Sequence, residues 1–197
     1  MSLAESVHSA DFILIVAAMS SAGLLHMLWL SSRFAQRFSL PIDGGRTVRG
    51  HRIFGPNKTW KGLCALPFAA ALSFFLVHLS LPYLPQFFQT AWWNLTGSQS
   101  AGLGWLCGLG FMLAELPNSF LKRQCDIPSG TVAQSQGLRI VFSILDRCDS
   151  ILGLVLVLWC LVPIHISTLL ALLVFGPAVH ALFSLLQFQL GLKGRAL

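Results

Sequence analysis

The stretch "GLCALPFAAALSFFLVHLSLPYL", from Gly62 to Leu84, decides the fold class of this protein. It contains no Asp, Glu, Lys or Arg, and it reaches the ~20 residues that a helix needs to cross a bilayer. Backbone amides in hydrocarbon must be bonded within the chain, so a helix is the expected spanning form. We therefore predict a transmembrane helix here.

Four further apolar runs carry almost no charge, and they cover residues 11–30, 102–116, 140–162 and 166–190. The 197-residue chain is 55% hydrophobic and only 10% charged, with a mean hydropathy of +0.72, far from the composition of soluble domains. We predict an all-α integral membrane protein, with a bundle of about five transmembrane helices in a single membrane-embedded domain over residues 1–197. Two polar loops are large enough to form a site: the first loop covers residues 31–62, and the second covers residues 113–130 and is followed by the acids within residues 138–153.

The basic residues predict the topology of this bundle. Seven of the 13 Lys and Arg residues lie between Arg33 and Lys61, and none lies in the connection at residues 82–101. The others are Lys122, Arg123, Arg139, Arg147, Lys193 and Arg195. Because cytoplasmic loops carry an excess of positive charge, we predict both polar loops at the cytoplasmic face, the N-terminus outside and the C-terminus inside.

The stretch "RIFGPNKTWKG", residues 52–62, precedes the first apolar run described above. Its Gly-Pro pair predicts a turn, and Asn57 or Thr59 is a candidate cap for a helix that begins near Trp60. A helix start offers free N–H groups and a positive dipole end, both suited to phosphate. Lys58 and Lys61 are three residues apart, so we predict that both ammonium groups lie on one side of the first turn.

An alternative is that these charges only orient the protein and hold anionic headgroups. We interpret Arg33 and Arg37, which follow the apolar run at residues 11–30, in that way. Asp43, the one acid of this loop, has two candidate roles, a pair with a loop arginine or a contact with nucleotide, and we favour the pair. The loop's own residues leave the choice between a phosphate site and a topological signal open.

Three of the seven acids, Glu115, Asp146 and Asp149, lie at ends of apolar runs. An unpaired charge within a bilayer costs at least ~2.5–3.5 kcal/mol, so each of these acids needs a partner. Asp146 and Asp149 are three residues apart, which places both carboxylates on one helix face. Glu115, Ser119 and Lys122 have the spacing of another shared face, although Pro117 is predicted to break or kink that helix.

Carboxylates that converge near cationic side chains suit a magnesium–phosphate centre, because Mg²⁺ prefers oxygen ligands and shares them with substrate phosphates. Two alternatives remain open. In the first, Asp146, Arg147 and Asp149 only form ion pairs, with partners among Lys122, Arg123 and Arg139. In the second, the chain is a small transporter or a non-catalytic membrane protein whose carboxylates bind ions.

Three strings occur in the order found in CTP-dependent lipid cytidylyltransferases. "KTWKG" (58–62), "SFLKR" (119–123) and "DRCD" (146–149) resemble elements of the phosphatidate cytidylyltransferases. The longer stretches "PIDGGRTVRGHRIFGPNKTWKG", "NSFLKRQCDIPSG" and "LDRCDSILG" are most similar to the CDP-archaeol synthase branch of that superfamily. The resemblance spans most of residues 41–153, and it departs at Ala114-Glu115, where the family generally has Gly-Asp.

This resemblance implies an enzyme that transfers a cytidylyl group from CTP to a lipid phosphate similar to archaetidic or phosphatidic acid, leaving a CDP-lipid and pyrophosphate. It implies one or two Mg²⁺ ions held by Asp146 and Asp149, with Glu115 as a further ligand. The implied catalytic residues are Lys58, Lys122, Arg123, Asp146 and Asp149. The implied substrate-binding residues are Asn57, Lys58, Thr59, Lys61, Ser119, Lys122 and Arg123. We expect CTP, the lipid acceptor and membrane lipids as partners, and no nucleic acid.

Overall fold

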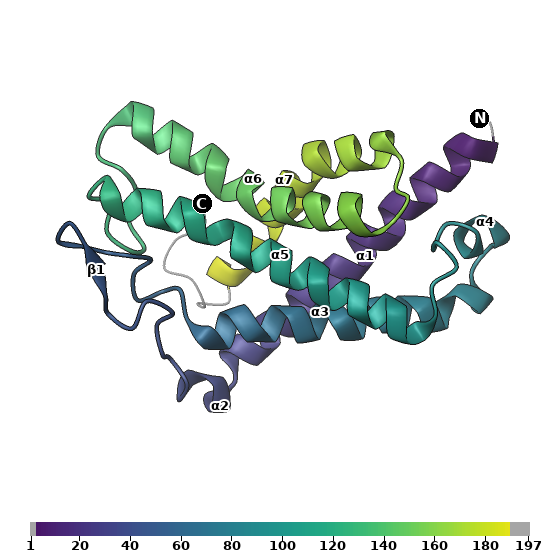
Figure 1. Cartoon of the computed structure of the whole chain (residues 1–197), viewed down its shortest axis with the longest axis horizontal. Helices are drawn as coiled ribbons and strands as arrows, with labels where there is room; N and C mark the ends of the chain where they lie inside the picture. The colour runs from purple at the N-terminus through teal and green to yellow at the C-terminus, as the bar shows by residue number, and fades with distance from the viewer. Residues whose placement is uncertain (1–2, 190–197) are drawn as a thin grey trace.

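Five long helices run back and forth through one bundle in the computed structural model, which describes residues 3–189 (Figure 1). They are α1 (Leu3–Ser31), α3 (Trp60–Ser80), α5 (Gly97–Gln124), α6 (Gln136–Leu161) and α7 (Ile166–Gln189). The shorter elements are α2 (Arg33–Gln36), β1 (Thr47–Val48), β2 (His51–Arg52), η1 (Leu81–Tyr83) and α4 (Gln86–Gln89). The all-α prediction is confirmed. Lys193 and Arg195, two of the basic residues used to predict the topology, lie outside the described residues.

Three of the helices are long and apolar enough to cross a membrane: α1 over Ala10–Ser31, α3 over Trp60–Tyr83, and α7 over Ile166–Phe183. Within residues 3–189, α5 and α6 do not reach that standard. These two helices carry the polar residues of the second loop, which lowers their apolar character. The structure thus supports an integral membrane protein, and five spans remain a prediction.

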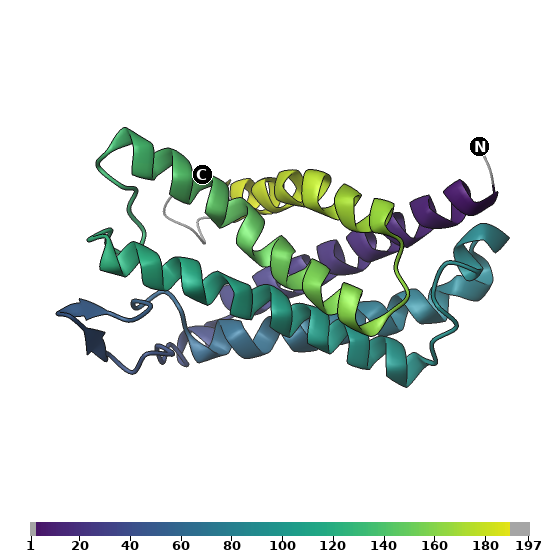
Figure 2. The same cartoon turned by 45° about the horizontal axis from the view of Figure 1, so that its top comes forward.

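Helix α5 lies between α3 and α6 in both views of the bundle (Figures 1 and 2). A Cβ atom added to Gly108 would lie 2.8 Å from the Cα of Pro67 on α3, and one added to Gly153 on α6 would lie 2.2 Å from the Gly110 carbonyl oxygen. The helix backbones therefore touch at these glycines, as small residues allow in membrane bundles. This close contact brings the acid-bearing middle of α6 beside the C-terminal half of α5.

Of the break or kink predicted at Pro117, a break is excluded, because α5 continues through Pro117 to Gln124, and a kink stays a prediction. A proline within a helix removes one backbone hydrogen bond. The turns after it are held from the side, since Asn118 and Lys122 both bond to carboxylates of α6. Side-chain contacts with the neighbouring helix thus keep this end of α5 helical.

The first loop has more order than its glycines and prolines predict. Strands β1 and β2 form an antiparallel hairpin, and Arg49 and Gly50 form its turn with positive φ angles of 53° and 83°. The buried carboxylate of Asp43 accepts hydrogen bonds from Arg52 and from three backbone N–H groups of the loop. The prediction that Asp43 pairs with a loop arginine is confirmed.

Candidate active site

Lys58 is positioned by a short extended pairing at the base of the first loop. The Ile42 N–H donates to the Lys58 carbonyl at 2.8 Å, and the Trp60 N–H donates to the Leu40 carbonyl at 3.0 Å. Thr59 occupies the N-cap position of α3, but its side chain makes no capping hydrogen bond. This pairing fixes the backbone of Lys58 immediately before the first turn of α3.

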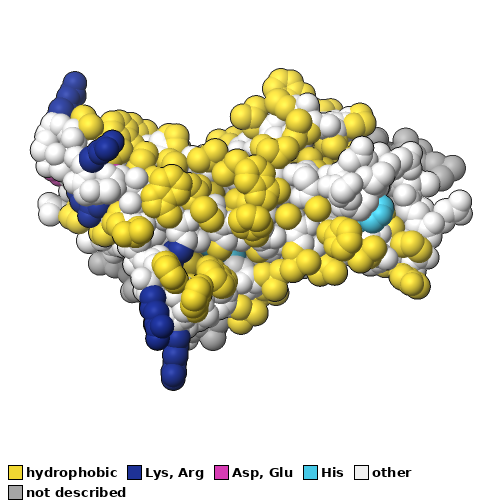
Figure 3. Space-filling model, turned by 60° about the horizontal axis from the view of Figure 1, so that its bottom comes forward, with side chains coloured by type: hydrophobic (Ala, Val, Ile, Leu, Met, Phe, Trp, Pro, Cys, Tyr) yellow, Lys and Arg dark blue, Asp and Glu magenta, His cyan; other side chains and the backbone are white. Residues whose placement is uncertain are grey.

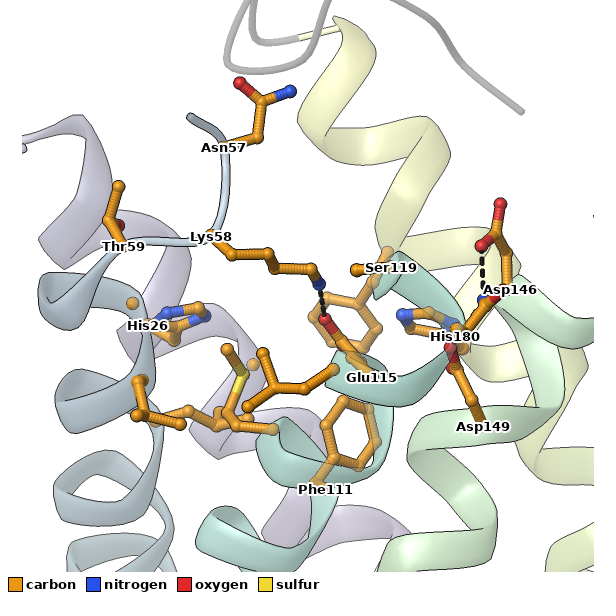
Figure 4. Close-up of a pocket in the computed structure, with 18 of the residues that line it drawn as sticks. His26, Asn57, Lys58, Thr59, Phe111, Glu115, Ser119, Asp146, Asp149 and His180 are labelled. Carbon is orange, nitrogen blue, oxygen red and sulfur yellow. Dashed lines mark hydrogen bonds and ion pairs between the residues drawn. The ribbon is translucent and has the colours of Figure 1, made fainter. Parts of the chain in front are cut away.

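The Lys58 side chain reaches across the site to α5, where its ammonium group donates to Glu115 (Figure 4). Burial alone would lower the pKa of the Lys58 ammonium, but the nearby Glu115 carboxylate raises this pKa above its usual value. Lys58 therefore remains a cation at neutral pH. It neutralises an acid that burial would otherwise make costly.

Lys58 and Lys61 diverge, so the prediction that both ammonium groups lie on one side of a helical turn is wrong. The Lys61 ammonium donates instead to the Ala35 carbonyl at 3.2 Å and to the Ser39 hydroxyl at 3.0 Å. The reason is that α3 begins at Trp60, so Lys58 lies outside the helix and helical spacing does not apply to it.

The three predicted carboxylates belong to one hydrogen-bond network. The Asn118 amide nitrogen donates to Asp146 at 2.7 Å and to Asp149 at 2.8 Å. The Ser150 hydroxyl donates to Glu115 at 2.8 Å and lies 3.2 Å from an Asp149 oxygen. Two residues that sequence reasoning missed, Asn118 and Ser150, thus link the acids.

The only signal for Asn118 and Ser150 in the sequence is their position close to acids. Asn118 follows Glu115 by three residues, and Ser150 directly follows Asp149, so both lie beside acids on helical segments. Amide and hydroxyl side chains are common at helix ends, and nothing in their type alone distinguishes a bridging residue from a solvated one. Their role becomes visible only when α5 and α6 are placed together.

The predicted ion pairs account for only part of the cluster. Lys122 pairs with Asp146, as that alternative expected. Arg147 donates instead to the carbonyl and hydroxyl of Ser143, and Arg123 donates to a backbone carbonyl. Within residues 3–189, Asp149 forms no ion pair with Lys or Arg, because its partners are Asn118 and Ser150. Simple charge pairing therefore leaves Asp149 unexplained.

The oxygen atoms of Asn118, Asp146 and Asp149 are suitable ligands for a divalent cation. The Asn118 side-chain oxygen is buried and has no hydrogen-bond partner in the described part of the chain. A turn of this amide would aim the oxygen at Asp146 and Asp149. Mg²⁺ is usually bound by one or two carboxylates together with substrate phosphates, so this small set of oxygens is sufficient.

The predicted three-carboxylate ligand set is divided in the structure. Among residues 3–189, no group of three or more His, Cys, Asp or Glu side chains is arranged to hold a metal ion. Glu115 is paired with Lys58, whereas Asp146 and Asp149 share Asn118. The metal role of Glu115 stays a prediction, and the pair on α6 is the part that fits.

All the predicted site residues line one cavity of about 900 Å³. They come from the first loop and the start of α3, from the C-terminal part of α5 and from the middle of α6, and they are Asn57, Lys58, Thr59, Lys61, Glu115, Ser119, Lys122, Arg123, Asp146 and Asp149. The cavity continues between the helices, where apolar side chains such as Met19, Phe111 and Leu172 form its walls. It therefore has a charged part and an apolar part.

A family model described as "CarS-like: CDP-archaeol synthase" matches residues 29–196. The chain belongs to this CDP-archaeol synthase family. The family assignment confirms the resemblance seen in the loop motifs, and its matched range includes every predicted site residue.

Curated relatives agree with the family model over most of their length. The CDP-archaeol synthase of Thermococcus onnurineus (strain NA1) is 28% identical over 184 residues, which cover 89% of this chain and 98% of the relative. That of Pyrococcus furiosus is 27% identical over 154 residues, and that of Halorubrum lacusprofundi is 30% identical over 167 residues. Each of these two alignments covers 78% of this chain and 81% of the relative. No solved structure gives a significant match.

Proposed function

We propose that this protein transfers the cytidylyl group of CTP to a membrane lipid phosphate of the archaetidic- or phosphatidic-acid type, at the cytoplasmic face of the membrane. Membership of the CDP-archaeol synthase family makes the chain a CTP-dependent lipid cytidylyltransferase, a nucleotidyltransferase. The observation that carries the finer proposal is the cavity, whose charged part suits a triphosphate and whose apolar part suits lipid chains. Both substrates can meet there.

In the proposed reaction, an oxygen of the lipid phosphate attacks the α-phosphorus of CTP. A new phosphorus–oxygen bond joins the two phosphates, while the bond from the α-phosphorus to the oxygen that bridges it to the β-phosphate breaks. Pyrophosphate leaves with the electron pair of that bond. A phosphate monoester is already largely ionised at neutral pH, so no strong general base is required. Catalysis then depends on positioning and charge neutralisation.

The charged part of the cavity offers side chains for both positioning and charge neutralisation. Asp146 and Asp149, with the oxygen of Asn118, would hold Mg²⁺, which when bound neutralises charge on the triphosphate and orients it. Lys122 and Arg123 line the same region and would bind phosphate oxygens of CTP or of the departing pyrophosphate. These residues come from the C-terminal part of α5 and from the middle of α6.

The loop before α3 supplies the opposite wall of the site. Lys58, Asn57 and Thr59 line the cavity there, and Lys61 lies at the edge nearest α2. Lys58 and the backbone amides around Asn57 and Thr59 would bind phosphate beside the start of α3. Ser119, a buried hydroxyl on α5, would orient a phosphate oxygen.

The face of the membrane follows from the charge distribution. Lys and Arg side chains gather at one end of the molecule, and hydrophobic side chains cover much of its middle (Figure 3). The site loops lie at this basic end, and α1 begins at the opposite end (Figure 1). The positive-inside rule then predicts a cytoplasmic site and an external N-terminus.

An impermeant maleimide tests that orientation. In a variant that keeps only Cys125, an exposed residue at the C-cap of α5, intact cells should give no labelling and opened cells should give full labelling. Labelling of Cys125 in intact cells would place the site at the outer face.

The activity itself is tested with purified protein, labelled CTP, Mg²⁺ and a panel of lipid phosphates that includes diether and diacyl acceptors. We expect a CDP-lipid from at least one acceptor and none from the Asp149→Asn variant. If no acceptor gives a CDP-lipid while proteoliposomes show ion or solute flux, the transporter alternative is correct.

A further inference from the structure

His26 is a polar residue on the cavity-lining face of α1. It lines the cavity together with Met19, Gly23, Met27 and Leu30, whose spacing of three or four residues marks one side of the helix. Its ring nitrogen Nε2 is buried and has no hydrogen-bond partner in the part of the chain that the structure describes. Residue 26 also lies just before residues 29–196, the range matched by the family model.

His26 lies at the boundary between the two parts of the cavity. Figure 4 shows its ring on the α1 side at the level of Glu115, with the Lys58 side chain reaching across the site. Deeper in the bundle, the cavity is lined by apolar residues such as Ile15, Leu154 and Leu172. A polar group at this level faces the place where an amphiphile would change from headgroup to chain.

The two substrates differ in how they can use this boundary. CTP is polar throughout and belongs in the charged part, between the first loop, the C-terminal part of α5 and the middle of α6. A lipid phosphate carries its chains in apolar surroundings, and these surroundings begin below His26. The phosphate of the acceptor would therefore lie at the level of His26.

We propose that His26 binds the phosphate of the acceptor lipid and so determines where that phosphate lies relative to CTP. A phosphate oxygen is an acceptor, so it selects the form of His26 that carries hydrogen on Nε2. The bond would give a partner to a buried polar atom that has none among residues 3–189. The proposal rests on the proposed function, because it concerns the acceptor of that same reaction.

A second histidine provides a matched control. His78 lies on α3, and its Nδ1 atom is also buried without a hydrogen-bond partner within the described residues. His78 does not line the cavity, and its ring lies near Gly97, at the start of α5 and away from the site. Replacement of His78 therefore changes a comparable side chain without touching the proposed acceptor position.

A binding experiment without CTP tests the proposal directly. Titration calorimetry compares a short-chain dialkylglycerol phosphate with the same dialkylglycerol lacking the phosphate, using wild type, His26→Ala, His26→Gln and His78→Ala in micelles. Loss of a hydrogen bond to a charged group weakens binding by roughly tenfold or more. We expect His26→Ala to show that loss for the phosphate only, His26→Gln to recover part of it through its amide donor, and His78→Ala to match wild type.

Steady-state kinetics add a second readout. His26→Ala should raise KM for the lipid acceptor by about tenfold and leave KM for CTP unchanged. Equal affinity of wild type and both His26 variants for the phosphate lipid would overturn the proposal, and so would equal increases in both KM values. If the wild type binds the lipid phosphate through His26 but forms no CDP-lipid, the proposed function fails while the binding assignment stands.

Discussion

Replacing Asp43 by Asn should loosen the loop that carries Lys58. The carboxylate of Asp43 is enclosed by Arg52 and by the N–H groups of Gly45, Phe54 and Gly55, at 3.0, 3.1 and 2.9 Å for the three amides. Asp43 uses one oxygen for Arg52 and Gly45 and the other for Phe54 and Gly55, and in asparagine an NH₂ donor replaces one of these two acceptor oxygens. Donors would then face donors in a buried place.

The size of the effect follows from the burial of the pair. Removal of one partner of a buried ion pair costs ~3–5 kcal/mol. The Asp43 side chain is fully buried, whereas the Arg52 side chain is 33% exposed and keeps some hydration, so we take the lower end of that range. Because 1.4 kcal/mol is a factor of ten, ~3 kcal/mol corresponds to a rise of roughly a hundredfold in the open population of the loop.

Amide hydrogen exchange measures that population at the affected groups. The N–H groups of Gly45, Phe54 and Gly55 should exchange roughly a hundredfold faster in Asp43→Asn. The control is Asp126→Asn, because Asp126 is 80% exposed and pairs with His51 at 3.0 Å. An exposed pair contributes at most ~1 kcal/mol, or about fivefold in exchange. Equal exchange rates of these three N–H groups in Asp43→Asn and Asp126→Asn would show that the Asp43 carboxylate does not hold the loop.

The Asp43–Arg52 pair predicts that the stability of the first loop depends on pH. Burial would raise the pKa of Asp43, but Arg52 and the three loop amides outweigh it and lower this pKa well below its usual value. A depressed folded pKa gives stability that is present above the unfolded pKa, ~3.9, and is lost as pH falls through the folded pKa. Protection of the loop amides, corrected for intrinsic exchange, should stay constant from about pH 7 to 5 and decline below about pH 4. In Asp43→Asn this decline should be absent.

Three further predictions concern the helices. Lys58→Met leaves Glu115 buried without a counter-charge, so the double variant with Glu115→Gln should have a higher thermal unfolding temperature than Lys58→Met alone; a lower one would contradict the pairing. Asn118→Leu should raise the Mg²⁺ concentration that gives half-maximal activity by roughly 10–100-fold, whereas an unchanged value would exclude Asn118 from the metal site. Gly153→Ala would place a Cβ 2.2 Å from a backbone oxygen and should destabilise the bundle by ~1–3 kcal/mol, while Gly137→Ala, in open space, should not lower the unfolding temperature.

The sequence predicts the acids and cations of the site for a physical reason. Charges next to long apolar runs are costly, so Glu115, Asp146 and Asp149 are conspicuous in a chain with seven acids. All the predicted site residues line one cavity. The family motifs supplied the activity, since the same charges are compatible with a transporter.

What the sequence did not predict depends on how helices meet. The Lys58–Glu115 pair and the bridging role of Asn118 require α3, α5 and α6 to be placed together in space. The prediction of a break or kink at Pro117 considered only the backbone of that helix, and the break is the part that the structure excludes. Contacts across the α5–α6 interface decide where this helix ends, because they hold the turns that follow the proline.

The most direct measurement follows the phosphorus atoms of CTP. Purified protein in nanodiscs is incubated with Mg²⁺, a lipid phosphate and CTP labelled at either the α- or the γ-phosphorus. The α label should appear in the lipid product and the γ label in pyrophosphate, in equal amounts, with neither product formed by Asp149→Asn. Appearance of the γ label in the lipid, or unchanged turnover by Asp149→Asn, would contradict cytidylyl transfer at this site.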